Sequence, residues 1–98
     1  NSYTQYSDQS LKENIADATP KLEEVKQIKV RNFNFKGEDL KQIGVIAQEL
    51  EPIFPGLVKE REMPGHEDPI KTVKYSVLVP ILIKAIQELE ARVATLEG

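Results

Sequence analysis

The sequence predicts an α+β fold, a small mixed domain of short strands and helices that ends in one long C-terminal helix. Short runs with apolar residues at every second position alternate with turn residues, which is typical of half-buried strands. Other short runs carry apolar residues three or four apart, which indicates small amphipathic helices. A longer run with the same helical spacing fills the end of the chain and predicts the long helix.

The length and composition fit one small folded domain. A chain of 98 residues buries only roughly 60–70% of its surface, so association with identical copies would stabilise it. Hydrophobic residues make up 40% and charged residues 30%, a globular composition rather than a disordered one. The chain does not begin with Met, and we expect it to be a piece of a longer protein.

The same numbers argue against several classes of partner. The net charge of −3 argues against nucleic acid, whose phosphates need a positive face. No apolar run approaches the roughly 20 residues of a membrane span, so no membrane contact is expected. The chain has no cysteine, which excludes disulfides and thiolate metal sites. We expect neither a metal site nor a cofactor.

The elements before the long helix are predicted from local patterns. Residues 1–7 look extended, and Ser7 or Asp8 would cap a helical turn reaching about Ile15. Thr19 and Pro20 predict the N-cap and first residue of a helix over residues 20–28. The remaining elements are strands and one helical turn: a strand at 30–36 with Phe33 and Phe35 on one face, a turn at 37–39, a strand at 43–47, a helical turn at 48–51, and strands at 57–59 and 70–75.

The C-terminal helix is predicted over residues 77–96, with Ser76 as its N-cap and Pro80 tolerated near the first turn. Six apolar residues repeat at alternating spacings of 3 and 4, in the a and d positions of a heptad pattern. These residues form the predicted seam: Val79, Leu82, Ile86, Leu89, Val93 and Leu96. We expect residues 76–97 to form a coiled coil between copies.

Two interpretations of this helix remain open. Ile83 and Ala85 widen the apolar stripe, which favours packing on the chain's own sheet up to about residue 86. Beyond Glu88 the stripe narrows to the a and d positions, which is what a partner helix needs. In simple coiled coils, isoleucine at the a positions with leucine at the d positions favours a bundle of two helices.

A serine and a lysine near the start of the chain could form a catalytic pair. Serine is a poor nucleophile until a base removes its proton. The single histidine, His66, lies in a loop between Gly65 and Glu67, which makes a Ser-His-Asp triad improbable. A lysine amine has an ordinary pKa of about 10.4, so a lysine base needs a dry site that lowers it. Ser7 and Lys12 are five residues apart and could meet if Ser7 lies extended, outside the helical turn.

Spacing alone favours a structural interpretation of the same residues. Asp8 and Lys12 are four apart and would form an ordinary acid–base pair on a helix surface. That pair would hold the lysine charged and oppose a role as base. In one continuous helix, side chains five residues apart point about 140° away from each other.

A family resemblance favours catalysis. The string Ser7-Asp8-Gln9-Ser10-Leu11-Lys12-Glu13-Asn14-Ile15 resembles the Ser-Asp-x-x-Leu-Lys-x-x-Ile opening of the intramolecular chaperone family of phage tail fibres, tailspikes and neck appendages, also called the S74 peptidase or endosialidase chaperone domain. The resemblance continues through residues 30–36, 43–50, 54–58, 74–78 and 82–89. All the strings occur in order, over roughly residues 7–96.

The resemblance implies a function. Such a domain ends a longer precursor, forms a homotrimer, helps the upstream fibre or tailspike stalk of the same precursor to fold, and then cuts itself free. It implies Ser7 as nucleophile, Lys12 as general base and Tyr6–Ser7 as the scissile bond. Residues 1–6 would then end the stalk, and residues 7–98 would be the chaperone domain. The setting would be the host cytoplasm during virion assembly, with the domain released from the mature fibre.

Further site members are implied less directly. Asp8, Asn14 and Glu49 match family strings and are expected to support the site. Backbone N–H groups after Ser7 are candidate donors to the developing oxyanion at Tyr6. Two other functions compete with the autoproteolytic one: a non-catalytic trimerisation cap that stays attached, and a monomeric adaptor that presents its helix to other proteins.

Overall fold

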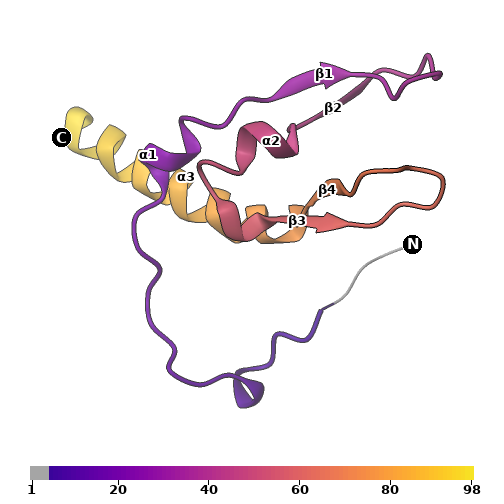
Figure 1. The fold of residues 1–98 in the computed structure, drawn as a ribbon. Coiled ribbons are helices and arrows are strands. Elements are labelled where there is room, and N and C mark those ends of the chain that lie inside the picture. The colour runs from indigo at the N-terminus through magenta and orange to yellow at the C-terminus, as the bar shows by residue number, and fades with distance from the viewer. Residues whose placement is uncertain (1–4) are drawn as a thin grey trace.

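The computed structural model describes residues 5–98. It confirms a mixed fold of short antiparallel strands with a long C-terminal helix (Figure 1). In chain order the elements are the 3₁₀ turn η1 (Gln9–Leu11), α1 (Leu22–Val25), β1 (Arg31–Phe33), β2 (Gln42–Gly44), α2 (Ala47–Leu50), the 3₁₀ turn η2 (Pro55–Leu57), β3 (Val58–Arg61), β4 (Ile70–Val73) and α3 (Tyr75–Glu97). The predicted extended segment 1–7 and the predicted stalk residues 1–6 lie in part outside the described residues.

The four strands form two separate antiparallel hairpins. In the first, Arg31 of β1 lies opposite Gly44 of β2. In the second, Val58 of β3 lies opposite Val73 of β4. Figure 1 shows both hairpins extending to the same side of the molecule, away from the C-terminal end of α3. Two hairpins cannot bury much surface by themselves, so their stability depends on the helices between them.

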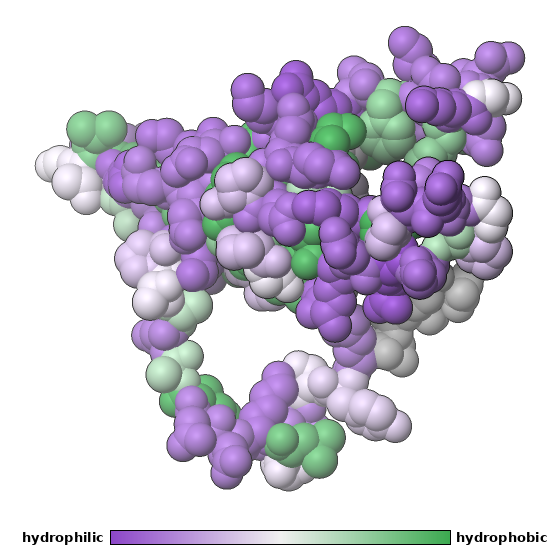
Figure 2. Space-filling model, in the orientation of Figure 1, coloured by the Kyte–Doolittle hydropathy of each residue, from purple (hydrophilic) through white to green (hydrophobic). Residues whose placement is uncertain are grey.

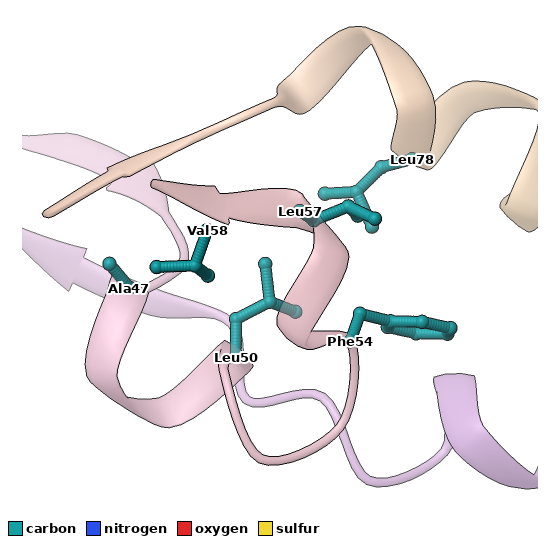
Figure 3. Close-up of a cluster of buried hydrophobic side chains, with 6 residues drawn as sticks. All are labelled: Ala47, Leu50, Phe54, Leu57, Val58 and Leu78. Carbon is teal, nitrogen blue, oxygen red and sulfur yellow. The ribbon is translucent and has the colours of Figure 1, made fainter. Parts of the chain in front are cut away.

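The core is small and lies around α2. Leu50 is only 1% exposed and is the largest side chain that is almost fully buried among the described residues. Its neighbours in the buried cluster come from α2, η2, β3 and the start of α3: Ala47, Phe54, Leu57, Val58 and Leu78 (Figure 3). This cluster joins the second hairpin, β3 and β4, to α2 and to the start of α3.

Polar contacts join α2 and α3 to the two hairpins. Glu49 of α2 accepts two hydrogen bonds from the Arg31 guanidinium of β1, at 3.0 and 2.7 Å. Glu51, which follows α2, pairs with Lys71 of β4. Tyr75 Oη accepts a hydrogen bond from the Val45 N–H at 3.0 Å, which ties the start of α3 to the residue after β2.

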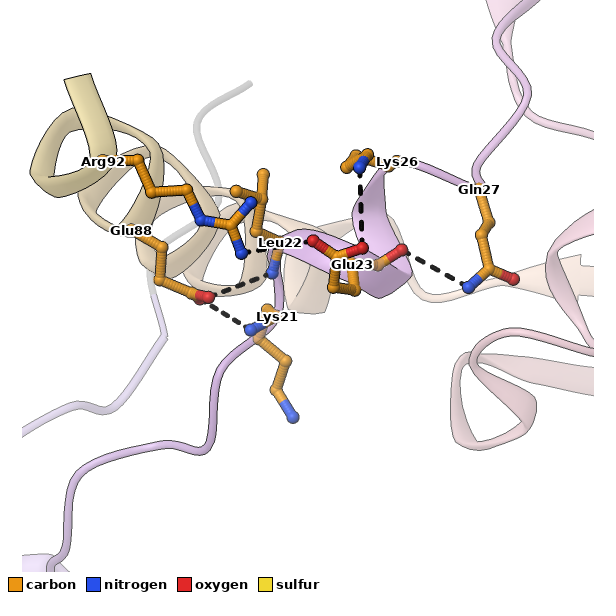
Figure 4. A network of polar contacts seen from close by, with 7 residues as sticks. All are labelled: Lys21, Leu22, Glu23, Lys26, Gln27, Glu88 and Arg92. Carbon is orange, nitrogen blue, oxygen red and sulfur yellow. Dashed lines mark hydrogen bonds and ion pairs between the residues drawn. The ribbon is translucent and has the colours of Figure 1, made fainter. Parts of the chain in front are cut away.

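The first helix is capped by the last one. The Glu88 carboxylate of α3 accepts hydrogen bonds from the N–H groups of Lys21 at 2.6 Å and Leu22 at 3.4 Å (Figure 4). Arg92 donates to Glu23 at 3.2 Å beside this cap. Thr19 and Pro20 were therefore the wrong choice for the start of this helix. An acceptor 66 or 67 residues away in the chain replaces the expected local cap.

The long helix begins two residues earlier than predicted. Lys74 is its N-cap, without a side-chain capping bond, so the prediction of Ser76 as N-cap was wrong. Pro80 is the sixth residue of the helix and lies past the first turn, not near it as predicted, because the helix begins earlier; its ring removes the bond to the Ser76 carbonyl and crowds that carbonyl. The helix has one face on the domain, with Leu78 and Ala85 buried and Ile81 partly buried.

Several other predicted elements are shorter than expected. The helical turn predicted to reach Ile15 is a single 3₁₀ turn, Gln9–Leu11. The strand predicted over 30–36 ends at Phe33, because the Asn34 amide donates to the carbonyls of Phe35 and Glu38 and so closes the loop of the hairpin. The strand predicted over 43–47 ends at Gly44, and Ala47 already begins α2.

The molecule is open for its size. Its radius of gyration is 17.2 Å, against about 13 Å for a compact domain of this length. Its accessible surface is 8577 Å², against about 5,700 Å² expected for a folded chain of this mass. Residues 5–20, which we call the arm, are exposed throughout. Figures 1 and 2 show the arm leaving the body near α1 and standing away from it.

Candidate functional site

The arm brings together the two residues singled out for catalysis. Lys12 Nζ lies 2.8 Å from Ser7 Oγ and donates a hydrogen bond to it. This distance is within the reach required between a nucleophile and its base. The contact is local, because both residues belong to the same short stretch of chain.

A short turn explains how residues five apart can meet. Asp8 is extended at φ −71°, ψ 137°, and Lys12 is extended at φ −119°, ψ 149°. Between them the chain makes a 3₁₀ turn, closed by hydrogen bonds from Leu11 N–H to Asp8 O at 3.1 Å and from Lys12 N–H to Gln9 O at 3.0 Å. Because Lys12 lies just beyond the turn, its side chain can fold back toward Ser7.

The Asp8 carboxylate forms the N-cap of this turn. Its Oδ1 accepts hydrogen bonds from the Ser10 N–H at 2.8 Å and from the Ser10 hydroxyl at 2.7 Å. The Ser10 hydroxyl, followed by the Ser10 backbone N–H, lowers the pKa of Asp8 below its ordinary value. The alternative expectation of an Asp8–Lys12 ion pair is wrong in this structure, where the Lys12 amine contacts Ser7 instead.

The bond expected to be cut lies at the exposed start of this arrangement. Tyr6 is 95% exposed. The N–H groups of Ser10, Leu11 and Lys12 are already bonded to Asp8 and Gln9. They are therefore not free to stabilise an oxyanion at Tyr6 in this conformation. These three N–H groups could reach the Tyr6 carbonyl only after a rearrangement of the arm.

The other expected supporting residues lie in different places. Asn14 is two residues after Lys12 and adopts a left-handed backbone with φ 55°, a conformation that asparagine tolerates better than most residues, so it redirects the arm. Glu49 lies on α2, where the hydrogen bonds from Arg31 hold its pKa below the ordinary value. It thus serves a structural contact. His66 Nδ1 lies 2.6 Å from the Asp68 carbonyl, in the loop between β3 and β4.

The site is not dry in the single chain. Every residue from 5 to 20 is exposed, including Leu11 at 68% and Ile15 at 65%. A lysine base needs an environment that disfavours its charged form. The arm therefore brings the predicted Ser7–Lys12 pair together in surroundings that are open to water.

The predicted seam is also uncovered. Its six residues are between 42% and 87% exposed. Their stripe adjoins and partly overlaps the face that carries Leu78 and Ala85, since Leu82 lies one turn after Leu78 and Leu89 lies one turn after Ala85. The first half of α3 packs on the domain through Leu78, Ile81 and Ala85, in agreement with the interpretation favoured up to about residue 86, whereas the seam side chains remain exposed. An apolar stripe of this length on one helix is typical of an interaction site.

Sequence patterns missed two residues of this region. Ser10 had no assigned role, although its hydroxyl contacts Asp8. Glu88 was treated as a polar flank of the seam, although it caps α1. For Ser10, the sequence offered one hint, which was its position two residues after the predicted N-cap Asp8. No sequence signal could have found Glu88, because its partners are distant in the chain.

Two negative findings apply to the described residues 5–98. They contain no group of three or more His, Cys, Asp or Glu side chains arranged to hold a metal ion. Within the same range, no helix is both long enough and apolar enough to cross a bilayer.

The fold and the arm define a small α+β domain that carries a Ser-Lys pair on an exposed segment and an uncovered heptad stripe on its last helix. A family model described as Peptidase_S74, chaperone of endosialidase, matches residues 7–59, just over half of the chain. The chain belongs to this family. No curated protein matches the chain.

Proposed function

We propose that this chain is an intramolecular chaperone that trimerises, helps an upstream phage tail fibre or tailspike of the same precursor to fold, and then releases itself by autoproteolysis at the Tyr6–Ser7 bond. In this proposal residues 1–6 end the upstream stalk and residues 7–98 form the chaperone. The observation that carries the catalytic part is the 2.8 Å contact between Lys12 Nζ and Ser7 Oγ. Membership in the family described as chaperone of endosialidase supports the chaperone part.

The reaction needs Lys12 in its neutral form. Ser7 Oγ bonds to the carbonyl carbon of Tyr6 while its proton passes to Lys12 Nζ. The bond from that carbon to the Ser7 nitrogen then breaks, and the lysine returns the proton to the departing nitrogen. An ester joins Tyr6 to Ser7 Oγ, and water hydrolyses it. The products are an upstream chain with a free carboxylate at Tyr6 and a domain that begins at Ser7.

Assembly supplies what the single chain lacks. Three helices meeting along Val79–Leu96 would cover the exposed apolar stripe. The arms would then lie beside neighbouring copies, whose surfaces could exclude water from Lys12. A site that becomes active only after assembly would delay cleavage until the stalk has trimerised. Such self-association takes place in the host cell during virion assembly, and release of the domain makes the folded fibre kinetically hard to undo.

The full exposure of the arm also favours a second candidate. If assembly leaves residues 5–20 in water, the lysine stays charged and the domain remains attached as a trimerisation cap. This candidate shares the seam with the first and differs only in the chemistry at Lys12.

The test is intact-mass measurement of the precursor and two variants, Ser7→Ala and Lys12→Ala. The proposal predicts a fragment that begins at Ser7 in the wild type and its loss in both variants, with at least about a hundredfold slower cleavage. Lys21→Ala is the matched control, because Lys21 Nζ also bonds to a hydroxyl on the arm, that of Thr19 at 2.8 Å, but lies outside the dyad. Uncut wild-type precursor would favour the attached cap.

A further inference from the structure

Ser10 lies between the two dyad residues and touches neither of them. Its hydroxyl and its backbone N–H both donate to the same oxygen of Asp8, at 2.7 and 2.8 Å. One residue therefore supplies both hydrogen bonds that hold this carboxylate. The hydroxyl makes the larger contribution to the lowered pKa of Asp8.

Asp8 is a natural competitor for the lysine of the dyad. Their opposite charges flank the same short turn and therefore attract one another. A lysine held by a carboxylate stays protonated and cannot accept the serine proton. The Lys12 amine can therefore contact Asp8 and remain charged, or contact Ser7 and serve as its base. In the structure it contacts Ser7.

We propose that Ser10 is a positioning residue for the dyad, whose hydroxyl holds Asp8 Oδ1 against the turn and so leaves the Lys12 amine to Ser7. The proposal rests on the proposed autoproteolysis and names a residue that tunes it. Ser10 contacts no reacting atom and acts only through Asp8.

Few carboxylates lie close to Lys12 along the arm. The acidic groups near the lysine along the arm are Asp8, Glu13 and Asp17. Of these, Asp8 is the one that caps the turn leading to Lys12. Within residues 5–98, no ion pair joins a charged group of another element to the arm. Asp8 is therefore the carboxylate whose position decides the contact of the lysine.

The first test is the pH dependence of cleavage in the full precursor. Ser10→Ala removes the hydroxyl bond and leaves only the backbone N–H on Asp8 Oδ1, so the carboxylate can turn toward Lys12. Cleavage at neutral pH should then slow by about twofold to fivefold, and the increase of the cleavage rate with pH should shift to higher pH. Ser10→Thr keeps the hydroxyl and should cleave like the wild type. Gln9→Ala, in the same turn, is the matched control and should leave the profile unchanged.

A double variant separates positioning from simple turn formation. Asp8→Asn combined with Ser10→Ala removes the competing charge, so the proposal predicts recovery of the wild-type pH profile. An unchanged profile in Ser10→Ala would overturn the proposal. So would a slowed Ser10→Ala that the added Asp8→Asn fails to restore, because Ser10 would then only shape the turn.

A second measurement does not depend on cleavage. The titration of the Asp8 carboxyl can be followed by NMR in the 98-residue chain, with and without Lys12→Ala. In the wild-type background the Lys12 change should leave the midpoint of Asp8 in place. In the Ser10→Ala background it should raise that midpoint by a few tenths of a pH unit. Equal responses in both backgrounds would overturn the proposal. An uncut wild-type precursor would refute the autoproteolysis alone, and this titration would still decide the role of Ser10.

Discussion

Single residues hold distant parts of this chain together, and Glu88 is the clearest case. The carboxylate of Glu88 on α3 accepts hydrogen bonds from the first N–H groups of α1, at Lys21 and Leu22. These groups have no partner within their own helix. The root of the arm is therefore fixed to the same helix that carries the exposed seam, on another of its faces.

Removing this cap should lower the stability of the domain. Glu88→Ala leaves both N–H groups without their acceptor, and we expect a loss of about 1 kcal/mol in the free energy of unfolding. Glu88→Gln keeps a side-chain oxygen that can accept the bonds and should lose less. Urea denaturation measures both. Glu90→Ala is the control, since Glu90 is an exposed acid of the same helix. Equal stability of the Glu88→Ala and Glu90→Ala variants would contradict the account.

At the scale of elements, two short hairpins are joined through α2 and the start of α3. Gly44, the last residue of β2, sits where any side chain would meet Tyr75 of α3. A Cβ added there would lie 2.8 Å from Tyr75 Oη and 3.2 Å from Phe33 Cε1. Since Tyr75 Oη also accepts a hydrogen bond from the Val45 N–H, this glycine permits the contact between the first hairpin and α3.

We expect Gly44→Ala to destabilise the domain by about 1–3 kcal/mol, the usual cost of overpacking. The added methyl would displace the Tyr75 hydroxyl and break its bond to Val45. Tyr75→Phe removes that hydroxyl, so the double variant should lose less than the sum of the two single losses. Thermal melts of the four proteins give the comparison. Gly56→Ala is the matched control, because its Cβ would meet nothing within 4 Å. Strict additivity would show that the contact is not responsible.

The spacing of apolar residues and the turn residues predicted which helices and strands form, but they predicted less well the residues at which these elements begin and end. The period of the apolar residues found the strands and the long helix, because that period follows directly from which face is buried. The start of α1 and the end of β1 could not be predicted, since the Glu88 cap and the Asn34 contacts decide them. The Ser7–Lys12 contact was expected from sequence, whereas the capping role of Ser10 was not, because it depends on a turn of only three residues.

At the scale of the whole molecule, too much apolar surface remains exposed for a self-sufficient domain. The total accessible surface of the molecule exceeds the value expected for a folded chain of this mass by about half. The exposed large apolar side chains lie on the arm, around the two hairpins and, in the greatest number, on α3. The arm and the seam both have apolar side chains that the rest of the single chain leaves exposed. In the proposed function, assembly of three copies covers the seam and the arm together.

In the proposed function, assembly along the seam makes the Ser7–Lys12 dyad active. Ile86 lies in the middle of the seam and is 64% exposed, so Ile86→Asp should leave the single chain folded. In the assembled seam each copy would lose about 1.5–3 kcal/mol of apolar burial and gain a costly carboxylate. Gln87→Asp introduces the same residue one position further on, outside the seam, and serves as the control.

The most direct measurement combines sedimentation with intact mass on the full precursor carrying each change. We expect the wild type and Gln87→Asp to form trimers and to yield a fragment that begins at Ser7. We expect Ile86→Asp to remain monomeric and uncut. A monomeric Ile86→Asp precursor that cleaves as fast as the wild type would contradict the account.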